Sequence, residues 1–412
     1  IVQTIEKTLA DENEFKQLFA IDLIKTMPLT PWKDTISDLF KNGTVNVKKA
    51  ILELAKDKAD IIIDQDIIQA SKQSEDIRPE AIAIAGTRKL SILSNDLQKN
   101  ISHSDLMIRA ASACSLVKLN DHVEEANTVM QKLLNSADVN EIKIALQFLD
   151  KPMGILDDNQ LVSFLQHKSP IIREESLKIA ETRQNPDFLD HIIGNLAYPK
   201  SSIQARQALS GFDEDSVLSA LEKWLYQADS NFPLRIGIIR CLKHYGVSKS
   251  ADILQKGLRE PYLNSLSEVT DSLLSVARKE PPSDEFIKMI GIELDIIAKR
   301  VYQLEIFLHC LPDDENCFLV RDHINSDIKK IIPIMLKLGV LHDPKTPIET
   351  YIQYVSSNDP ELMPFVLELV DTTFAPENRR LTMPLIDTDM DTVKTGKDLF
   401  DDILIEFDNL LL

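Results

Sequence analysis

The acidic segment near the carboxyl end of the chain has the spacing of a metal-binding loop. Asp387, Asp389 and Asp391 are arranged as at the start of a calcium loop, and Asp398 stands where such loops place a bidentate Glu. Calcium loops also need a glycine at their sharp turn, but this sequence has Thr392 there, and Lys394 replaces the usual apolar residue. We therefore expect a solvated acidic segment rather than a calcium site.

A second cluster with ligand-type side chains contains His309, Cys310 and Cys317. Neighbouring residues of a helix point to different faces, and no fourth ligand is evident, so we expect no metal and instead buried packing of the two thiols. The chain has two further cysteines, Cys114 and Cys241. Four scattered cysteines do not make a disulfide framework, which favours a reducing, cytosolic compartment.

Catalytic signatures are missing from the sequence. It contains no HExxH, GxSxG or CxxC motif, and its Thr395-Gly396-Lys397 segment lacks the upstream glycine of a phosphate loop. The eight histidines are dispersed, and none pairs with a nucleophile and an orienting acid. We predict no catalytic, cofactor-binding or metal-binding residue, and hence a protein that is not an enzyme.

Four arginines recur at similar places in the sequence and could line a groove for an acidic ligand; they are Arg78, Arg109, Arg173 and Arg235. A structural role is favoured, because repeated positions stack in register. Each arginine would pair with a turn carboxylate or carbonyl near Asp76, Asp105 and Asp229, forming a ladder between repeats.

Two tryptophans lie among apolar residues at helical spacing. These are Trp32 and Trp224, and we expect both in the core rather than as platforms for a ligand.

The elements that would position these side chains follow from one phrase that recurs about every 31 residues, in which an aliphatic residue is followed by a basic or polar residue and then by small and apolar residues. A period of this size predicts an all-α solenoid of antiparallel helix pairs, an α-α superhelix, since one pair cannot bury its apolar face alone. The phrase occupies residues 47–52, 77–82, 108–113, 172–177, 234–239 and 269–274, and looser forms occupy 141–146 and 204–209.

Composition supports this architecture and limits the partners. The 412 residues include only 11 glycines, and 65 Asp and Glu outweigh 46 Lys and Arg for a formal net charge of −19. Such a charge disfavours nucleic acid and anionic membrane surfaces. No segment has the roughly 18 consecutive apolar residues of a membrane span. Because the sequence starts at Ile1 without Met, we expect an excised part of a longer polypeptide.

The repeat pattern divides the chain into three parts. Residues 1–283 follow the period, whereas 284–347 read as an irregular insert with a long helix over 284–311 and a second helical stretch over 324–338. Residues 348–412 read as a terminal repeat, with helices over 348–356 and 361–373, followed by an acidic capping helix.

The period and the repeated phrase resemble HEAT-type repeats over nearly the whole chain. In addition, residues 365–374 (FVLELVDTTF) and 379–387 (RRLTMPLID) resemble a phrase in bacterial membrane proteins that join an ATP/ADP translocase-like domain to a cytoplasmic HEAT array. The opening segment 20–24 and the helix over 284–311 fit the same layout. The resemblance implies the HEAT portion alone, cytoplasmic and tethered to the inner membrane through a missing domain, with no transport residue carried over.

These observations favour a non-catalytic protein-interaction or regulatory scaffold whose partner is another domain of its own parent chain. Two alternatives stay open. One is an enzyme on a HEAT-like scaffold, of the DNA glycosylase or bilin lyase type, which would need a local basic face despite the acidic total. The other is a receptor for an acidic peptide or ligand, which would need the arginine series to face solvent.

Overall fold

The computed structural model describes residues 2–58, 61–73, 76–149, 154–227, 231–245, 247–259, 263–280, 282–312, 314–357, 359–387, 389–400 and 403. Within these ranges all regular secondary structure is helical, and no strand occurs. The predicted all-α class is confirmed.

The chain forms two compact units, residues 1–192 and 193–412, and α13 (Leu189–Gly194) contains the boundary. The other helices of unit 1 are α1 (Val2–Leu9), α2 (Glu14–Ile24), α3 (Lys33–Asn42), α4 (Val45–Asp57), α5 (Asp64–Gln73), α6 (Arg78–Thr87), α7 (Ser94–Asn100), α8 (Leu106–Leu119), α9 (Val123–Leu134), α10 (Val139–Gln147), α11 (Asp158–Leu165) and α12 (Pro170–Arg183). Those of unit 2 are α14 (Ser202–Leu209), α15 (Glu214–Leu225), α16 (Phe232–Leu242), α17 (Val247–Lys256), α18 (Leu263–Ala277), α19 (Asp284–Cys310), α20 (Phe318–Gly339), α21 (Ile348–Ser357), α22 (Met363–Thr373), α23 (Pro376–Ile386) and α24 (Thr392–Leu399).

Helix starts are fixed by local sequence signals. Side-chain oxygens of Asn13, Thr44, Asp105 and Asp138 accept hydrogen bonds from the first backbone N–H groups of α2, α4, α8 and α10. Such caps satisfy donors that have no partner inside the helix. Pro170 begins α12, where its missing N–H costs nothing. Single residues in the turns therefore fix where these helices begin.

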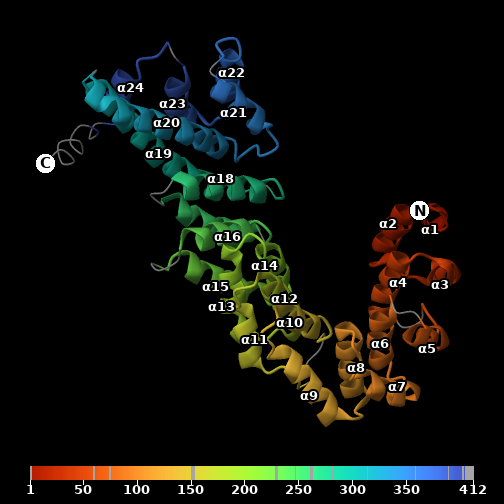
Figure 1. Ribbon diagram of the computed structural model, residues 1–412. Coiled ribbons are helices and arrows are strands. Elements are labelled where there is room, and N and C mark those ends of the chain that lie inside the picture. Colours follow the sequence, from red (N-terminus) through yellow and green to blue (C-terminus); the bar gives the residue numbers. More distant parts are fainter. Residues whose placement is uncertain are drawn as a thin grey trace. The chain divides into compact units, whose positions relative to one another are not determined.

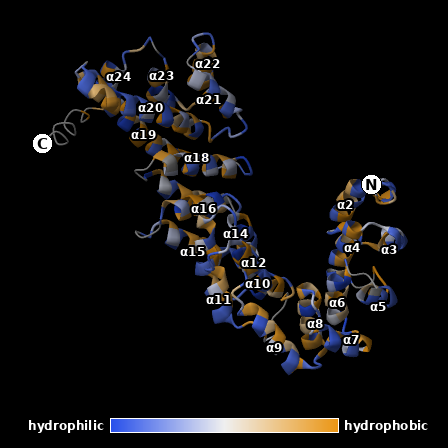
Figure 2. Cartoon of the chain, in the orientation of Figure 1, coloured by the Kyte–Doolittle hydropathy of each residue, from blue (hydrophilic) through white to orange (hydrophobic). Residues whose placement is uncertain are grey.

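Each unit is a stack of helix pairs in which the second helix of a pair packs on its own first helix and on the second helix of the next pair. In unit 1 this gives a continuous row of α2, α4, α6, α8, α10 and α12. Figure 1 shows α3, α5 and α7 on one side of the start of that row. Polar and apolar residues alternate around the helices (Figure 2), as pairs with one buried face require.

Close crossings within the row depend on small residues. A Cβ on Gly86 of α6 would lie 2.6 Å from the Ser115 Cα of α8, and the Ser115 hydroxyl donates to the Ile82 carbonyl at 2.8 Å. In unit 2, Gly237 of α16 lies against the Leu196 carbonyl of the 3₁₀ helix η4 (Asn195–Ala197). These contacts set the spacing between neighbouring pairs.

The long helices of unit 2 continue the stack. α19 matches the helix predicted over 284–311, α20 begins six residues before the predicted 324, and α20 packs on both α19 and α18. α21 and α22 match the two predicted helices of the terminal repeat. α24 packs on α19, where its buried Gly396 faces the Tyr302 ring. The apolar residues 410–412 lie outside the described residues.

None of the described helices is both long enough and apolar enough to span a membrane.

Candidate functional site

The arginines of the series form local hydrogen bonds. Arg109 donates from Nε and Nη2 to the His103 carbonyl at 2.9 and 2.8 Å, and Arg173 donates from Nη1 to the His167 carbonyl at 2.8 Å. Both bonds close the turn that precedes the arginine's own helix. The predicted pairing with turn carbonyls is therefore confirmed for these two residues, but these bonds fix turns within a pair rather than a ladder between repeats.

The other two arginines of the series behave differently from each other. Arg235 donates to the Gln227 carbonyl at 3.5 Å, and Asp229 lies outside the described residues. Arg78 instead binds the Asn100 side chain of the following pair at 2.9 Å. The predicted carboxylate partner Asp105 caps α8 through its bonds to backbone N–H groups. The described hydrogen bonds of this series therefore fix turns or join successive pairs, in keeping with the structural role that the sequence favours.

Two arginines that the sequence reasoning missed occupy equivalent places at the ends of second helices. Arg88 binds the Ile62 carbonyl at 2.6 Å and Asp64 at 2.9 Å, and Arg183 binds the Leu156 carbonyl and Asp158, both at 2.7 Å. Their side chains are only 8% and 9% exposed. Each arginine joins the end of the second helix of a pair to the start of the first helix. The sequence could have indicated this bond, because a basic residue at the end of a helix follows an acidic residue at a helix start by about 25 positions.

The His309 and cysteine cluster is not buried. Cys310 is exposed at the end of α19, and Cys317 is half-buried in the turn before α20, so the predicted buried packing of these two thiols is wrong. The reason is that Pro312 and the following polar residues break the helix there, which leaves both thiols at a surface turn. Among the described residues, no group of three or more His, Cys, Asp or Glu side chains could hold a metal ion.

The acidic cluster serves local backbone structure. Asp391 caps α24 through the Lys394 N–H at 2.9 Å, and Asp387 accepts from the Asp389 N–H at 3.0 Å, while Asp398 is exposed on α24.

The two tryptophans differ in burial. Trp32 is 1% exposed and donates to the Val2 carbonyl at 3.2 Å, as expected of a core residue, whereas Trp224 is only half-buried on α15.

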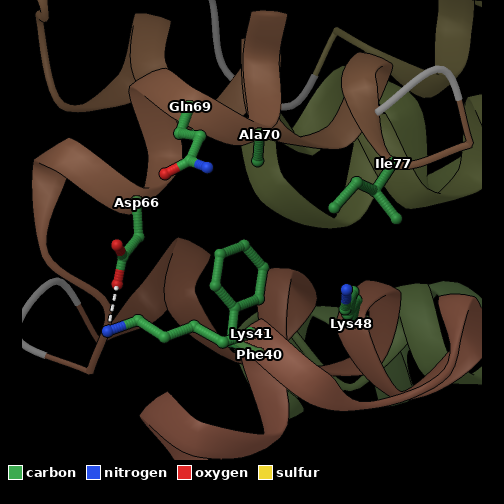
Figure 3. Close-up of a pocket in the computed structure, with 7 residues that line it drawn as sticks. All are labelled: Phe40, Lys41, Lys48, Asp66, Gln69, Ala70 and Ile77. Atoms are coloured by element: carbon green, nitrogen blue, oxygen red, sulfur yellow. Dashed lines mark ion pairs between the residues drawn. The ribbon is translucent and has the colours of Figure 1, made fainter. Parts of the chain in front are cut away.

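Unit 1 contains a pocket between α3, α4 and α5, with a volume of about 310 Å³ (Figure 3). Its walls are Phe40, Ala70 and Ile77, all buried, and Asp66 lies 3.5 Å from the Lys41 Nζ at one end. Lys48 lies at the other end in Figure 3, near Ile77. The pocket could hold a small carboxylate, but its own Asp66 already neutralises one of its two cations.

Unit 2 contains a groove along α14, η4 and α16, with a volume of about 460 Å³. Two of its apolar side chains are well exposed, Ile203 at 67% and Phe232 at 44%. Arg206 and Arg240 also line it. Arg240 binds Glu268 at 2.7 Å, but Arg206 forms no ion pair with a carboxylate in the described part of the chain. We name this feature, defined by these residues, the α14–α16 groove.

Arg206 of the α14–α16 groove lies near His244, together with Lys243 and Lys279. Burial lowers the pKa of His244, and the nearby cations Arg206, Lys243 and Lys279 lower it further. Exposed apolar surface beside unneutralised cations is suited to a partner that carries apolar and acidic side chains. The hydroxyl of Ser202, at the edge of the groove, donates to the Pro199 carbonyl at 3.1 Å rather than to a base.

Comparison with known proteins adds little beyond the fold. No family model matches the chain, and no curated protein sequence matches it. Similar solved structures include human deoxyhypusine hydroxylase in complex with glycerol, 12% identical with a TM-score of 0.30, covering 67% of this chain and 96% of the hydroxylase. Kap121p bound to RanGTP is 11% identical with a TM-score of 0.41, covering 99% of this chain and 51% of Kap121p. Importin beta is 10% identical with a TM-score of 0.29, covering 93% of this chain and 62% of importin beta.

The chain therefore spans about half the length of the Kap121p chain it matches. The class is defined by the structure itself: an all-α solenoid of stacked helix pairs that recur about every 31 residues.

Proposed function

We propose that the protein is a non-catalytic interaction scaffold whose α14–α16 groove binds protein segments that combine apolar and acidic residues. The observation that carries the proposal is the exposure of Ile203 and Phe232 next to Arg206, which has no carboxylate partner in the described residues. A bound apolar side chain would gain burial, and a bound carboxylate would gain a charge-assisted hydrogen bond. The enzyme alternative is disfavoured because no described groove residue pairs a nucleophile with a base.

A peptide library displayed on phage tests the proposal. We expect the chain to enrich peptides in which an aromatic or aliphatic residue lies next to Asp or Glu. The double variant Ile203→Glu with Arg206→Glu should lose this enrichment. Ile92→Glu is the matched control, because Ile92 is 74% exposed but lies in unit 1. Equal enrichment by all three chains, or enrichment of basic peptides, would contradict the proposal.

We further propose that the natural partner is another domain of the same parent polypeptide, and that this polypeptide is a translocase-like membrane protein with the HEAT portion in the cytoplasm. The resemblance of residues 365–374 and 379–387 supports this proposal; these residues form much of α22 and α23, and Phe365 is 53% exposed there. Co-purification of the tagged chain with the membrane-embedded and downstream domains of its reading frame, at low and physiological salt, is the test. If the double variant Ile203→Glu with Arg206→Glu still captures these domains, the contact lies on another surface. If the unmodified chain captures none of them, a partner on a separate polypeptide is favoured.

A further inference from the structure

The sequence after α24 has the composition that the α14–α16 groove requires. Residues 401–412 read DDILIEFDNLLL, with four carboxylate side chains, no cation and seven apolar residues. Within this segment the structure describes Ile403, which is 1% exposed. We propose that residues 404–412 of one copy of the chain bind in the α14–α16 groove of a second copy. This inference rests on the function proposed above.

Charge and shape both favour this occupant. Glu406 and Asp408 flank Phe407, so one apolar ring lies between two carboxylates in the sequence. The groove offers Arg206 and Arg240 together with the exposed side chains of Ile203 and Phe232. Although Arg240 already binds Glu268, a guanidinium has five N–H donors and can serve a second carboxylate. A volume of about 460 Å³ lies in the range of sites that enclose small ligands, and is ample for an aromatic anchor.

The groove of the same copy is a poor target, because the path to it is long. α24 packs on α19, α19 on α20, α20 on α18, and α18 on α16. Three packed helices thus stand between α24 and α16 along this path of contacts. Nine residues reach at most about 30 Å when fully extended, so we take the groove of a second copy as the target of the segment. A neighbouring copy places no such limit on the segment.

Binding of a tail to a different surface of the next copy is a heterologous contact, which need not close on itself. Association should therefore increase steadily with concentration rather than stop at a dimer. Any other protein that uses the groove would have to displace the tail.

Sedimentation velocity of the full chain over roughly 1–100 µM tests the inference. We expect the average mass to rise with concentration. A chain ending at Ile403 keeps that buried residue and should remain monomeric, as should Ile203→Glu with Arg206→Glu. An equimolar mixture of these two variants should form a heterodimer that grows no further, since only one groove and one tail are intact. Ile92→Glu, exposed in unit 1, should associate like the unmodified chain.

A fluorescein-labelled peptide of residues 401–412, titrated with the chain ending at Ile403, measures the contact directly. Replacing Glu406 and Asp408 with Lys in the peptide should weaken binding at least about tenfold. The inference would be overturned if the full chain stayed monomeric at every concentration. It would also be overturned if Ile203→Glu with Arg206→Glu associated like the unmodified chain. If library peptides bind the groove but this peptide does not, the tail inference alone fails; if neither binds, the proposed function fails with it.

Discussion

Single glycines control how closely the helix pairs stack. At Gly237, a Cβ would meet the Leu196 carbonyl of η4, which is backbone and cannot swing away as a side chain can. Gly194, in contrast, is also helical, but nothing lies within 4 Å of the position where its Cβ would be. The two positions therefore separate the effect of crowding from the effect of helix propensity.

We predict that Gly237→Ala destabilises the protein by about 1–3 kcal/mol, because the crowded helices must move apart. This cost outweighs the gain of up to ~1 kcal/mol that Ala brings to a helix. Gly194→Ala should be neutral or stabilising. Urea unfolding followed by circular dichroism measures both, and equal effects of the two substitutions would mean that the α16–η4 contact is looser than described.

His244 lies near Arg206, one of the cations of the α14–α16 groove. Its pKa lies below the usual value because of burial and because of Arg206, Lys243 and Lys279. The unfolded chain thus takes up a proton near the ordinary His pKa of about 6.5, whereas the folded chain resists it. The contribution of His244 to stability is complete above that pH and is lost as the pH falls toward the lower folded value.

We predict that Arg206→Glu raises the pKa of His244, since a cation is replaced by an anion. NMR titration of the imidazole protons measures the shift. Lys118→Glu in unit 1 is a control of equal charge change and should leave the His244 titration in place. An unmoved His244 pKa in Arg206→Glu would show that burial alone depresses it.

At the scale of elements, the sequence predicts helices well because caps and apolar periods are local. Asp105 and Asp138 cap α8 and α10, and the helix predicted over 284–311 is α19 almost to the residue. The groove was not predictable in this way, because Ile203 and Phe232 lie about 30 residues apart and line one groove only because α14 and α16 both pack on η4. The exposure of Cys310 likewise depends on the turn geometry after α19.

α2 shows how one element can depart from the pattern of its neighbours. Its Phe15, Phe19 and Leu23 lie four residues apart and are 83%, 62% and 46% exposed. In α8, by comparison, the face that packs on α6 carries the small residues Ala111 and Ser115, which are fully buried. Large side chains are accommodated on α2 because the described chain places no helix over them.

α19 is held to the preceding pair by a buried carboxylate. Glu293 is 2% exposed and accepts from Arg259 Nε at 3.0 Å and from Arg259 Nη2 at 2.8 Å. We predict that Arg259→Ala lowers the urea midpoint, because an unpaired charge is left buried. Adding Glu293→Gln should recover part of the loss. Arg300→Ala, at an exposed position on α19, is the control, and an equal effect there would rule out a specific role for the pair.

At the scale of the molecule, stability should be local, because the main contacts of the described helices up to α18 run between successive pairs; beyond them, α19 also packs on α23 and α24, and α20 on α23. The two compact units, residues 1–192 and 193–412, each have their own buried core. We expect a disturbance in one unit to remain within that unit. One substitution in each unit that crowds a contact between helices tests whether the two units respond independently.

We predict that Gly86→Ala in α6 speeds amide hydrogen exchange in α6, α8 and adjoining helices of unit 1, where the added Cβ would crowd Ser115. Gly237→Ala should do the same around α16 in unit 2. Gly86→Ala should leave exchange in α20 of unit 2 unchanged, and Gly237→Ala should leave exchange in α4 of unit 1 unchanged. Mass spectrometry of exchanged peptides resolves these helices in one experiment. If Gly86→Ala instead accelerated exchange uniformly in both units, the chain would unfold as one cooperative body, and nearest-neighbour contacts would not account for its stability.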